Sequence, residues 1–283
     1  MGGSSLPRSP AGPAERRWSA ALAEWAIPQE ILDRAPESPW GFPPSLFRAA
    51  HEDLVNPDTP SHQRALEALP EGGIVLDVGV GAGRSSLPLV ARAGCVVGVD
   101  ESESMLASFA DAAGELGVRH RTVQGRWPEI ASEAGAADVV VCHHVLYNVS
   151  QLSPFVGALT AAARRRVVAE ITASHPQLAL NELWLHFHGL ERPTRPTFSD
   201  ALAVLEEMGL DVKIERWQRR RAPHSVDRAK LVAFVRRRLC LPADKDPEVD
   251  ALLAEDHVTR PMDLVTLWWE PARPTGAGAK LPA

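Results

Sequence analysis

The sequence predicts an α/β domain in which a parallel sheet is covered by helices on both faces. Short apolar runs alternate with helical patterns from residue 74 onward, and this alternation is typical of a parallel sheet. The first run, residues 74–78, leads into a turn with glycines at 79, 81 and 83. Glycine has no Cβ, so its backbone can pass close under a ligand. We therefore expect a ligand site at the end of the first strand.

Composition limits the class of protein. The chain has 283 residues, 45% of them hydrophobic, and a formal net charge of −6. This length suits one large domain, or one domain with an extension, and the charge argues against nucleic acid as a partner. No run reaches the roughly 18 apolar residues of a membrane span, and no signal-peptide pattern is present. We expect a cytoplasmic protein without membrane contact.

The N-terminal quarter is expected to form a tail and a helical cap. Residues 1–16 are rich in Gly, Ser and Pro, which predicts a disordered tail. Residues 17–69 show short helical patterns broken by prolines, including one over 45–55 and one that Thr59 and Pro60 begin. The loop 36–47 combines prolines with aromatic residues, which indicates a rigid cover. An arm that packs over the sheet edge explains the same pattern equally well.

Strands and helices then alternate through residues 70–270. The expected strands cover 74–78, 95–100, 118–124, 137–143, 166–172, 211–217 and 263–269. The expected helices cover 84–94, 103–116, 153–163, 176–188 and 197–209, with Ser102 as an N-cap and Gly117, Gly189 and Gly209 as stops. Residues 218–261 are expected to be a helical insertion with helices over 225–239, capped by Ser225, and 246–255. Residues 271–283 are expected to be a tail.

Two cofactor classes use a Gly-x-Gly turn, and the spacing distinguishes them. The dinucleotide fingerprint requires a third small residue three positions after the second glycine, but Arg84 stands there. Here the third glycine follows Gly81 by two positions, and Asp77 precedes the first glycine by two. The pattern D-x-G-x-G-x-G resembles the signature of class I S-adenosylmethionine-dependent methyltransferases. The next strand ends in Asp100, roughly 20 residues on, where a ribose-binding carboxylate is expected.

The resemblance covers roughly residues 70–217 and implies both a fold and an activity. The implied fold is a Rossmann-like, doubly wound sheet of seven strands, in the order 3-2-1-4-5-7-6 with strand 7 antiparallel. The implied activity is methyl transfer from S-adenosyl-L-methionine to a small-molecule acceptor, with S-adenosyl-L-homocysteine as product, in a monomer or homodimer. A non-catalytic methyltransferase-like binding protein and an NAD(P)-dependent oxidoreductase are the alternatives. No Asn-Pro-Pro-Tyr follows the fourth strand, which removes the usual signal for acceptors on bases or glutamine.

The resemblance assigns cofactor contacts to the loops after the first four strands. These residues are Asp77, Gly79, Gly81, Gly83, Asp100, Glu101, Met105, Gly125, Arg126, Trp127 and His143. The family usually has an acid that accepts from the adenine amine where Arg126 stands, so this contact departs from the pattern. Trp127 suits either stacking on the purine ring or a place in the core.

The acceptor side is expected after the fourth and fifth strands. His144, Tyr147 and His188 are the candidate general bases, and Glu170 is an acid expected to face the same crevice. Asn181, Trp184 and His188 share one helical face, so Trp40, Asn181 and Trp184 are expected to line the acceptor pocket. An amphipathic helix packed on the sheet is the alternative for this face. The three cysteines and the histidines show no metal-binding spacing, so no metal is expected.

Overall fold

A computed structural model describes residues 11–40, 58–219, 227–253 and 261–272. It contains a seven-stranded sheet in the order β3-β2-β1-β4-β5-β7-β6. The strands are β1 (Gly73–Val78), β2 (Ala93–Asp100), β3 (His120–Gln124), β4 (Ala137–His143), β5 (Ala163–Thr172), β6 (Lys213–Arg219) and β7 (Met262–Trp269). Strands β1 to β5 pair in parallel, and β7 is antiparallel to both β5 and β6. This confirms the predicted strand order and direction.

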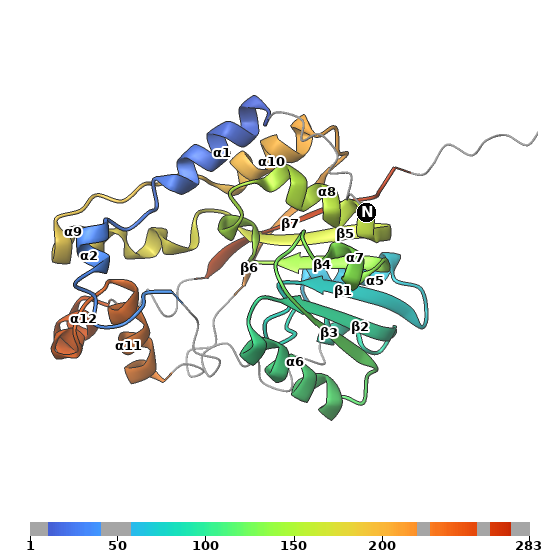
Figure 1. Ribbon diagram of the computed structural model, residues 1–283, viewed down its shortest axis with the longest axis horizontal. Coiled ribbons are helices and arrows are strands. Elements are labelled where there is room, and N and C mark those ends of the chain that lie inside the picture. Colours follow the sequence, from blue (N-terminus) through green and yellow to red (C-terminus); the bar gives the residue numbers. More distant parts are fainter. Residues whose placement is uncertain (1–10, 41–57, 220–226, 254–260, 273–283) are drawn as a thin grey trace, which may run out of the picture.

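Helices and 3-10 turns surround the sheet (Figure 1). The helices are α1 (Pro13–Ala23), α2 (Gln29–Leu32), α5 (Pro60–Ala68), α6 (Glu103–Glu115), α7 (Ala131–Ala134), α8 (Leu152–Ala162), α9 (Asn181–His188), α10 (Phe198–Glu207), α11 (Arg228–Arg238) and α12 (Asp246–Leu252). The 3-10 turns are η1 (Leu87–Leu89), η2 (Leu146–Asn148), η3 (Pro176–Leu180) and η4 (Ala243–Lys245). In the described ranges, no helix has the length and apolarity needed to cross a membrane.

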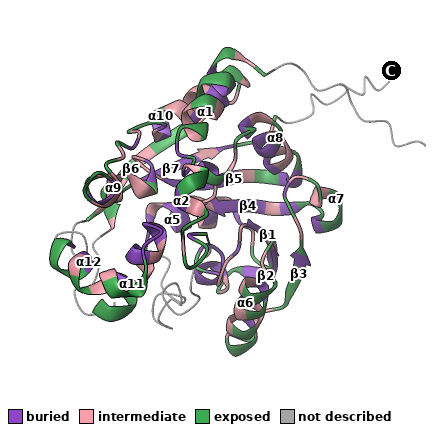
Figure 2. Cartoon of the chain, turned by 60° about the vertical axis from the view of Figure 1, so that its left-hand side comes forward, coloured by how far each residue is buried: buried purple, intermediate pink, exposed green. Residues whose placement is uncertain are grey.

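Two hydrophobic cores lie on opposite faces of the sheet. Side chains alternate between the faces along each strand, so Leu76 enters one core and its neighbour Val75 the other. Helices α1, α8 and α10 cover the first face, and α5 and α6 cover the second. Figure 2 shows the buried residues concentrated on the strands between these layers. Burial on both faces explains why the central strands β1, β2 and β4 are nearly continuous apolar runs.

A third core lies outside the sheet, in a helical lobe made by α2, α9, α11 and α12. Its apolar side chains, such as Ile31, Trp184, Val235 and Val249, pack on one another. Strands β5 and β6 end where β7 begins, since Thr172 pairs with Leu264 and Arg219 with Met262. The lobe is therefore attached at the carboxyl edge of the parallel strands, and it lies at the left of Figure 1.

The connection after the glycine turn differs from the predicted helix over 84–94. It is a 3-10 turn, η1, and β2 already begins at Ala93. The connection must span the six-residue β1, which at about 3.3 Å per residue is roughly 20 Å. As an α-helix the segment 84–92 would cover only about 14 Å, and the larger rise of 3-10 structure, about 2 Å per residue, covers more. The predicted helix over 84–94 is therefore wrong.

The N-terminal segment also departs from prediction. Helix α1 begins at Pro13, inside the predicted tail, because Gly12 and Pro13 form a helix start and the backbone N–H of Ala14 donates to Glu207. The helices of segment 17–69 separate: α1 joins the first face, α2 the lobe and α5 the second face. The expected helix over 45–55 lies outside the described residues. Ser225 does too, and Asp227 is the N-cap of α11.

Candidate functional site

The end of β1 holds a buried acid without a partner. The Asp77 side chain is fully buried, and within the described part of the chain neither carboxyl oxygen has a hydrogen-bond partner of normal geometry. Burial raises the pKa of Asp77 to about 7, although the nearby hydroxyls of Ser86 and Ser85 oppose the shift. Buried polar groups are normally hydrogen-bonded. A donor or cation from a ligand would supply what Asp77 lacks.

Different structural constraints explain the glycine at each of the three positions in the following turn. All have positive φ, at 78°, 51° and 86°. A Cβ on Gly79 would lie 2.4 Å from Cγ2 of Val145, and one on Gly83 would lie 2.5 Å from Cδ1 of Leu87. A Cβ on Gly81 would meet nothing within 4 Å. Packing therefore explains the outer two, and Gly81 borders the open space that a ligand can enter.

Asp100, at the end of β2, fixes the glycine turn in place. Its Oδ2 accepts from the backbone N–H of Gly81 at 3.0 Å, and its Oδ1 accepts from that of Ser102 at 2.9 Å. A carboxylate oxygen has two lone pairs, so each oxygen retains one for a ligand hydroxyl. Asp100 can therefore support the turn and bind a ribose at the same time.

The residues expected around the adenine divide into an exposed group and a buried one. Glu101 and Arg126 are mostly exposed and form an ion pair at 3.9 Å. Met105 lies in the first turn of α6, partly buried, and the backbone N–H of Gly125 donates to the carbonyl of Asp100 at 3.0 Å.

Trp127 belongs to the core. Its ring is buried in the first core, and its indole N–H donates to the carbonyl of Phe155 at 3.2 Å. The expectation that Trp127 contacts the cofactor is therefore wrong, because the ring is already held inside the fold.

A second buried acid, Glu170, lies at the end of β5 beside His143 of β4. Its carboxylate accepts from Ser61 Oγ at 2.6 Å and lies 2.9 Å from Nε2 of His144 and 3.4 Å from the Arg219 guanidinium. Burial by itself would raise the pKa of Glu170, but His143, the hydrogen bond from His144 and the charge of Arg219 hold it below its usual range. Glu170 is therefore ionised and acts only as an acceptor.

His144 is held by Glu170 at two points. Its backbone N–H donates to the carbonyl of Glu170 at 2.8 Å, and its imidazole bonds to the carboxylate. Its φ of 60° lies in the left-handed region, which is uncommon outside glycine and concentrates at functional sites. The side chain is 38% exposed. His144 is thus fixed in orientation and open to solvent.

His143 and His62 complete this cluster as buried, neutral histidines. Burial lowers the pKa of His143 to about 3, and its Nδ1 lies 4.0 Å from Glu170. Burial also lowers the pKa of His62, whose ring centroid is 6.0 Å from that of His143. Nε2 of His62 contacts the carbonyl of Arg84 at 3.2 Å. The cluster is therefore joined directly to the end of the glycine turn.

Tyr147 does not reach the crevice. Its hydroxyl donates to the carbonyl of Thr172 at 3.0 Å, and its ring lies between those of Trp18 and His175. Burial raises the pKa of Tyr147 well above its usual range. A buried phenol that holds its proton this strongly is unsuited to act as a base, so this expectation is wrong.

The predicted acceptor pocket is also wrong. Trp184 is fully buried in the lobe core, and His188 Nε2 contacts the carbonyl of Leu239 at 2.7 Å. Asn181 donates to the carbonyls of Arg192 and Pro193, while the Trp40 side chain is 51% exposed. The shared helical face packs against the helices of the insertion and not on the sheet, so the expected packing on the sheet is wrong as well.

Several residues near Glu170 could not be recognised as site residues from the sequence pattern. Ser61 and His62 follow a helix-starting proline, Arg219 ends β6, and Thr266 lies inside an apolar strand. The last of these is the one detectable signal, because a polar residue inside a run that is buried on both faces needs a partner.

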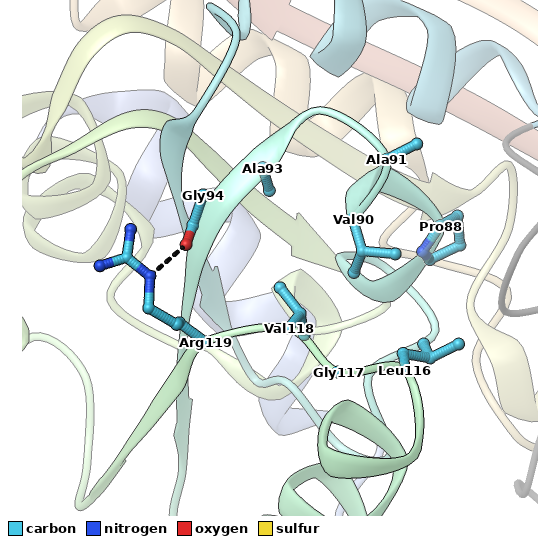
Figure 3. A pocket seen from close by; sticks show the side chains of 9 residues that line it. All are labelled: Pro88, Val90, Ala91, Ala93, Gly94, Leu116, Gly117, Val118 and Arg119. Atoms are coloured by element: carbon cyan, nitrogen blue, oxygen red, sulfur yellow. Dashed lines mark hydrogen bonds between the residues drawn. The ribbon is translucent and has the colours of Figure 1, made fainter.

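A hollow of about 500 Å³ lies at the amino ends of the parallel strands, between the start of β2 and the loop before β3 (Figure 3). Its lining residues are Pro88, Val90, Ala91, Ala93, Gly94, Leu116, Gly117, Val118 and Arg119. It contains none of the candidate site residues described above. In the described ranges, no group of three or more His, Cys, Asp or Glu side chains is arranged to hold a metal ion.

Comparison with known proteins identifies the domain. Residues 75–169 match the family model of a methyltransferase domain. An uncharacterized protein of Haemophilus influenzae is 28% identical over 167 residues, which make up 58% of this chain and 61% of that protein. The chain thus spans about three-fifths of the length of this relative.

Solved structures with the same fold cover most of both chains. The YcgJ protein of Bacillus subtilis has a TM-score of 0.51 at 16% identity, over 79% of this chain and 100% of its own. Magnesium protoporphyrin IX methyltransferase of Synechocystis, with S-adenosylhomocysteine bound, has a TM-score of 0.50 at 13% identity, over 91% and 99%. The glycine turn, Asp77 and His143 all lie inside the matched region 75–169. The chain therefore has the fold of the class I methyltransferases, and its residues 75–169 are similar to a methyltransferase domain.

Proposed function

We propose that this protein transfers a methyl group from S-adenosyl-L-methionine to a small-molecule acceptor at the carboxyl edge of the sheet. The observation that carries the proposal is Asp77, a buried acid whose oxygens have no hydrogen-bond partner of normal geometry among the described residues, at the start of a turn in which Gly81 borders open space. Ligands of open α/β sheets bind in the crevice beyond the carboxyl ends of the strands. The acid, the open glycine and Asp100 all lie there.

The residues present fit this cofactor. Asp77 would accept from the donor groups of the methionine portion, and Gly81 would let the backbone approach it. Asp100 has lone pairs left for the ribose hydroxyls, and Met105 and Gly125 lie next to the place expected for the adenine. Bound there, the cofactor would supply an electrophilic methyl group. The protein would contribute mainly by aligning acceptor and methyl, which can account for a large part of a rate enhancement.

The test compares two glycines that have similar backbone dihedral angles but lie at opposite ends of the parallel strands. Gly81 and Gly117 have φ of 51° and 67°, and a Cβ on either meets nothing within 4 Å. Both valine variants carry similar strain, but only Gly81→Val obstructs the proposed site. We expect calorimetry to show that Gly81→Val loses S-adenosylhomocysteine binding while folded Gly117→Val keeps it. Wild-type affinity in folded Gly81→Val contradicts the proposal, and loss in Gly117→Val would move the site to the hollow of Figure 3.

Two further measurements separate the alternative functions. A fluorescence titration with NADH tests the oxidoreductase, and we expect no saturable signal because Arg84 replaces the third small residue of the dinucleotide fingerprint. Mass spectrometry of small molecules incubated with protein and S-adenosylmethionine tests turnover. Binding without any methylated product would favour the non-catalytic alternative.

A further inference from the structure

We propose that the acceptor carries a weakly acidic hydroxyl group, of the phenol or enol type, and that His144 removes its proton while Glu170 positions His144. This inference rests on the proposed function. Its starting point is the bond between His144 Nε2 and Glu170 Oε1, at 2.9 Å. Because an ionised carboxylate can only accept, Nε2 carries the hydrogen and Nδ1 has the free lone pair.

His144 lies next to the turn that would hold the methyl donor. The following residue, Val145, touches Gly79 so closely that a Cβ there would clash at 2.4 Å. From the other side, His62 contacts the carbonyl of Arg84 at 3.2 Å. The backbone of His144 is therefore close to the proposed donor site, and the 38% exposure of its side chain leaves the imidazole accessible to an acceptor.

Glu170 is braced so that its charge and position are fixed. Ser61 has one hydroxyl hydrogen, which it donates to Glu170 at 2.6 Å, so Thr266 must be the donor in its 2.7 Å contact with Ser61. The indole N–H of Trp217 donates to Thr266 at 3.0 Å. All three donors in this series point toward the carboxylate, and such series polarise one another cooperatively. Glu170 itself is 1% exposed, so it acts through His144.

The neighbouring groups are unsuited to the same task. His143 has a pKa lowered to about 3 by burial and lies inside the fold, and His62 is buried behind it. Arg219 has only hydrogen-bond donors and faces Glu170. Of the groups that surround Glu170, His144 alone combines a bonded carboxylate with an exposed ring among the described residues.

The chemistry that needs such a pair is the methylation of a hydroxyl. His144 takes the acceptor proton at Nδ1 while the acceptor oxygen bonds to the methyl carbon, and the carbon–sulfur bond breaks with its electron pair left on sulfur. The imidazolium that forms is stabilised by Glu170 and later returns its proton to water. An aromatic amine, a thiolate or a carboxylate acceptor attacks with an available lone pair and needs no such base. Proton transfer is most efficient when the pKa values are close, and phenols, at about 10, are nearer to imidazole than alkyl alcohols.

The activity test uses the purified protein with S-adenosylmethionine and four benzene derivatives, phenol, aniline, benzoate and thiophenol, together with 4-nitrophenol. We expect mass spectrometry to detect methyl transfer to phenol in preference to the other three. Faster transfer to aniline, benzoate or thiophenol, or no transfer to either phenol, overturns the inference. Calorimetry with S-adenosylhomocysteine keeps the two proposals apart, because loss of binding would instead contradict the proposed function.

Two variants test the roles of the pair. Asparagine tolerates the left-handed backbone, so His144→Asn should keep the fold and lower kcat for phenol by about 100-fold. Glu170→Gln should lower kcat with little change in KM. For both variants, the loss of kcat relative to the wild type should be smaller with 4-nitrophenol, because its hydroxyl is more acidic and loses its proton more readily without a base. A purely structural role would impair both phenols equally, and that result overturns the inference.

The chain offers a matched control and a readout that needs no acceptor. His186 and Glu248 form a similar pair at 3.0 Å on the lobe surface, and His186→Asn should leave kcat unchanged. In the protein saturated with S-adenosylhomocysteine, nitrogen NMR should show His144 as the Nε2–H tautomer, and Glu170→Gln should disturb it. An Nδ1–H tautomer in the wild type contradicts the proposed base.

Discussion

Asp77 and Glu170 are two buried carboxyl groups at the carboxyl edge of one sheet, and their surroundings are opposite. Asp77 has no hydrogen-bond partner of normal geometry among the described residues, and burial raises its pKa to about 7 against the opposing effect of the Ser86 and Ser85 hydroxyls. Glu170 is equally buried but contacts Ser61, His144 and Arg219, and its pKa is lowered. Burial alone therefore does not decide the ionisation of these acids, because the charged and hydrogen-bonding groups around each carboxyl determine the direction of its pKa shift.

This difference distinguishes two parts of the candidate site. The part around Glu170 has its partners within the protein, and the part around Asp77 would need a ligand to supply them. The end of β5 receives its compensating charge and hydrogen bonds from α5, β4 and β6 within the protein. The end of β1 leaves an acid whose charged form is unfavourable until a cation or donor arrives. Functional sites are often places where local stability is sacrificed. Asp77 fits this description, and Glu170 does not.

Removal of Glu170 should have the largest effect on stability. Glu170→Ala leaves the charge of Arg219 and the hydroxyl of Ser61 without their acceptor, and breaking a buried ion pair typically costs about 3–5 kcal/mol. We expect urea unfolding at pH 7 to show a loss of that size, with Glu170→Gln less affected because its amide oxygen still accepts. A loss below about 1 kcal/mol, the net value of one ordinary hydrogen bond, would show that the cluster contributes little.

Replacement of Asp77 should shift stability in the opposite direction. Its pKa is about 7 in the fold and 3.8 in the reference state, so at pH 8 the ionised form disfavours the fold by up to about 4 kcal/mol, at 1.36 kcal/mol per pKa unit. Asp77→Asn should therefore stabilise the ligand-free protein at pH 8 and abolish S-adenosylhomocysteine binding. Thermal unfolding and calorimetry measure the two effects. If Asp77→Asn is less stable than the wild type at pH 8, Asp77 has a partner in solution.

The pH dependence should separate Asp77 from the buried histidine beside Glu170. For Asp77 the folded pKa is raised, so its contribution to stability is present below pH 3.8 and is lost as the pH rises through 7. For His143 the folded pKa is lowered to about 3, so its contribution is present above pH 6.5 and is lost as the pH falls toward 3.

The stability that Asp77→Asn gains over the wild type should accordingly be near zero at pH 4 and reach its maximum at pH 8. In the same measurement, His143→Gln should lose less stability relative to the wild type at pH 4 than at pH 7. Unfolding curves at several pH values test both trends. A gain in Asp77→Asn that does not change with pH would place the cause in packing instead of charge.

The smallest effect is expected at Asp100, which differs from both acids because it is only partly buried and accepts from two backbone N–H groups. Asp100→Asn keeps one acceptor oxygen but weakens the bond to Gly81 and removes the charge that would attract the ribose hydroxyls. We expect the dissociation constant of S-adenosylhomocysteine to rise about tenfold, equivalent to 1.4 kcal/mol. Calorimetry measures it, and an unchanged constant would place the ribose away from β2.

Local pattern was sufficient to predict the sheet, and the proposed donor residues follow from the same pattern. The central strands β1, β2 and β4 were recognisable because burial on both faces requires continuous apolar runs. Asp77, Gly81 and Asp100 were recognisable because they follow two such runs at a fixed spacing. The helix predicted after the glycine turn was wrong because local pattern does not register the distance that a connection must span.

The acceptor half was less predictable because it is assembled from distant segments. Helical spacing placed Trp184 and His188 on one face, but it could not reveal that α11 and α12 cover that face. The Glu170 cluster brings together α5, β4, β5, β6 and β7, and the pairing of Ser61 with Thr266 joins residues far apart in the chain. Only the tertiary fold brings these polar side chains into contact.

The separate core of the helical lobe has a consequence for how the protein opens in solution. Proteins unfold in cooperative units with different free energies, and the apolar side chains of the lobe pack mainly on one another. We expect the amides of α9, α11 and α12 to exchange hydrogen together, at a lower opening free energy than those of β1, β4 and β5. Such openings would expose the carboxyl edge while the sheet stays intact, so that a bulky acceptor could enter and its product leave without global unfolding.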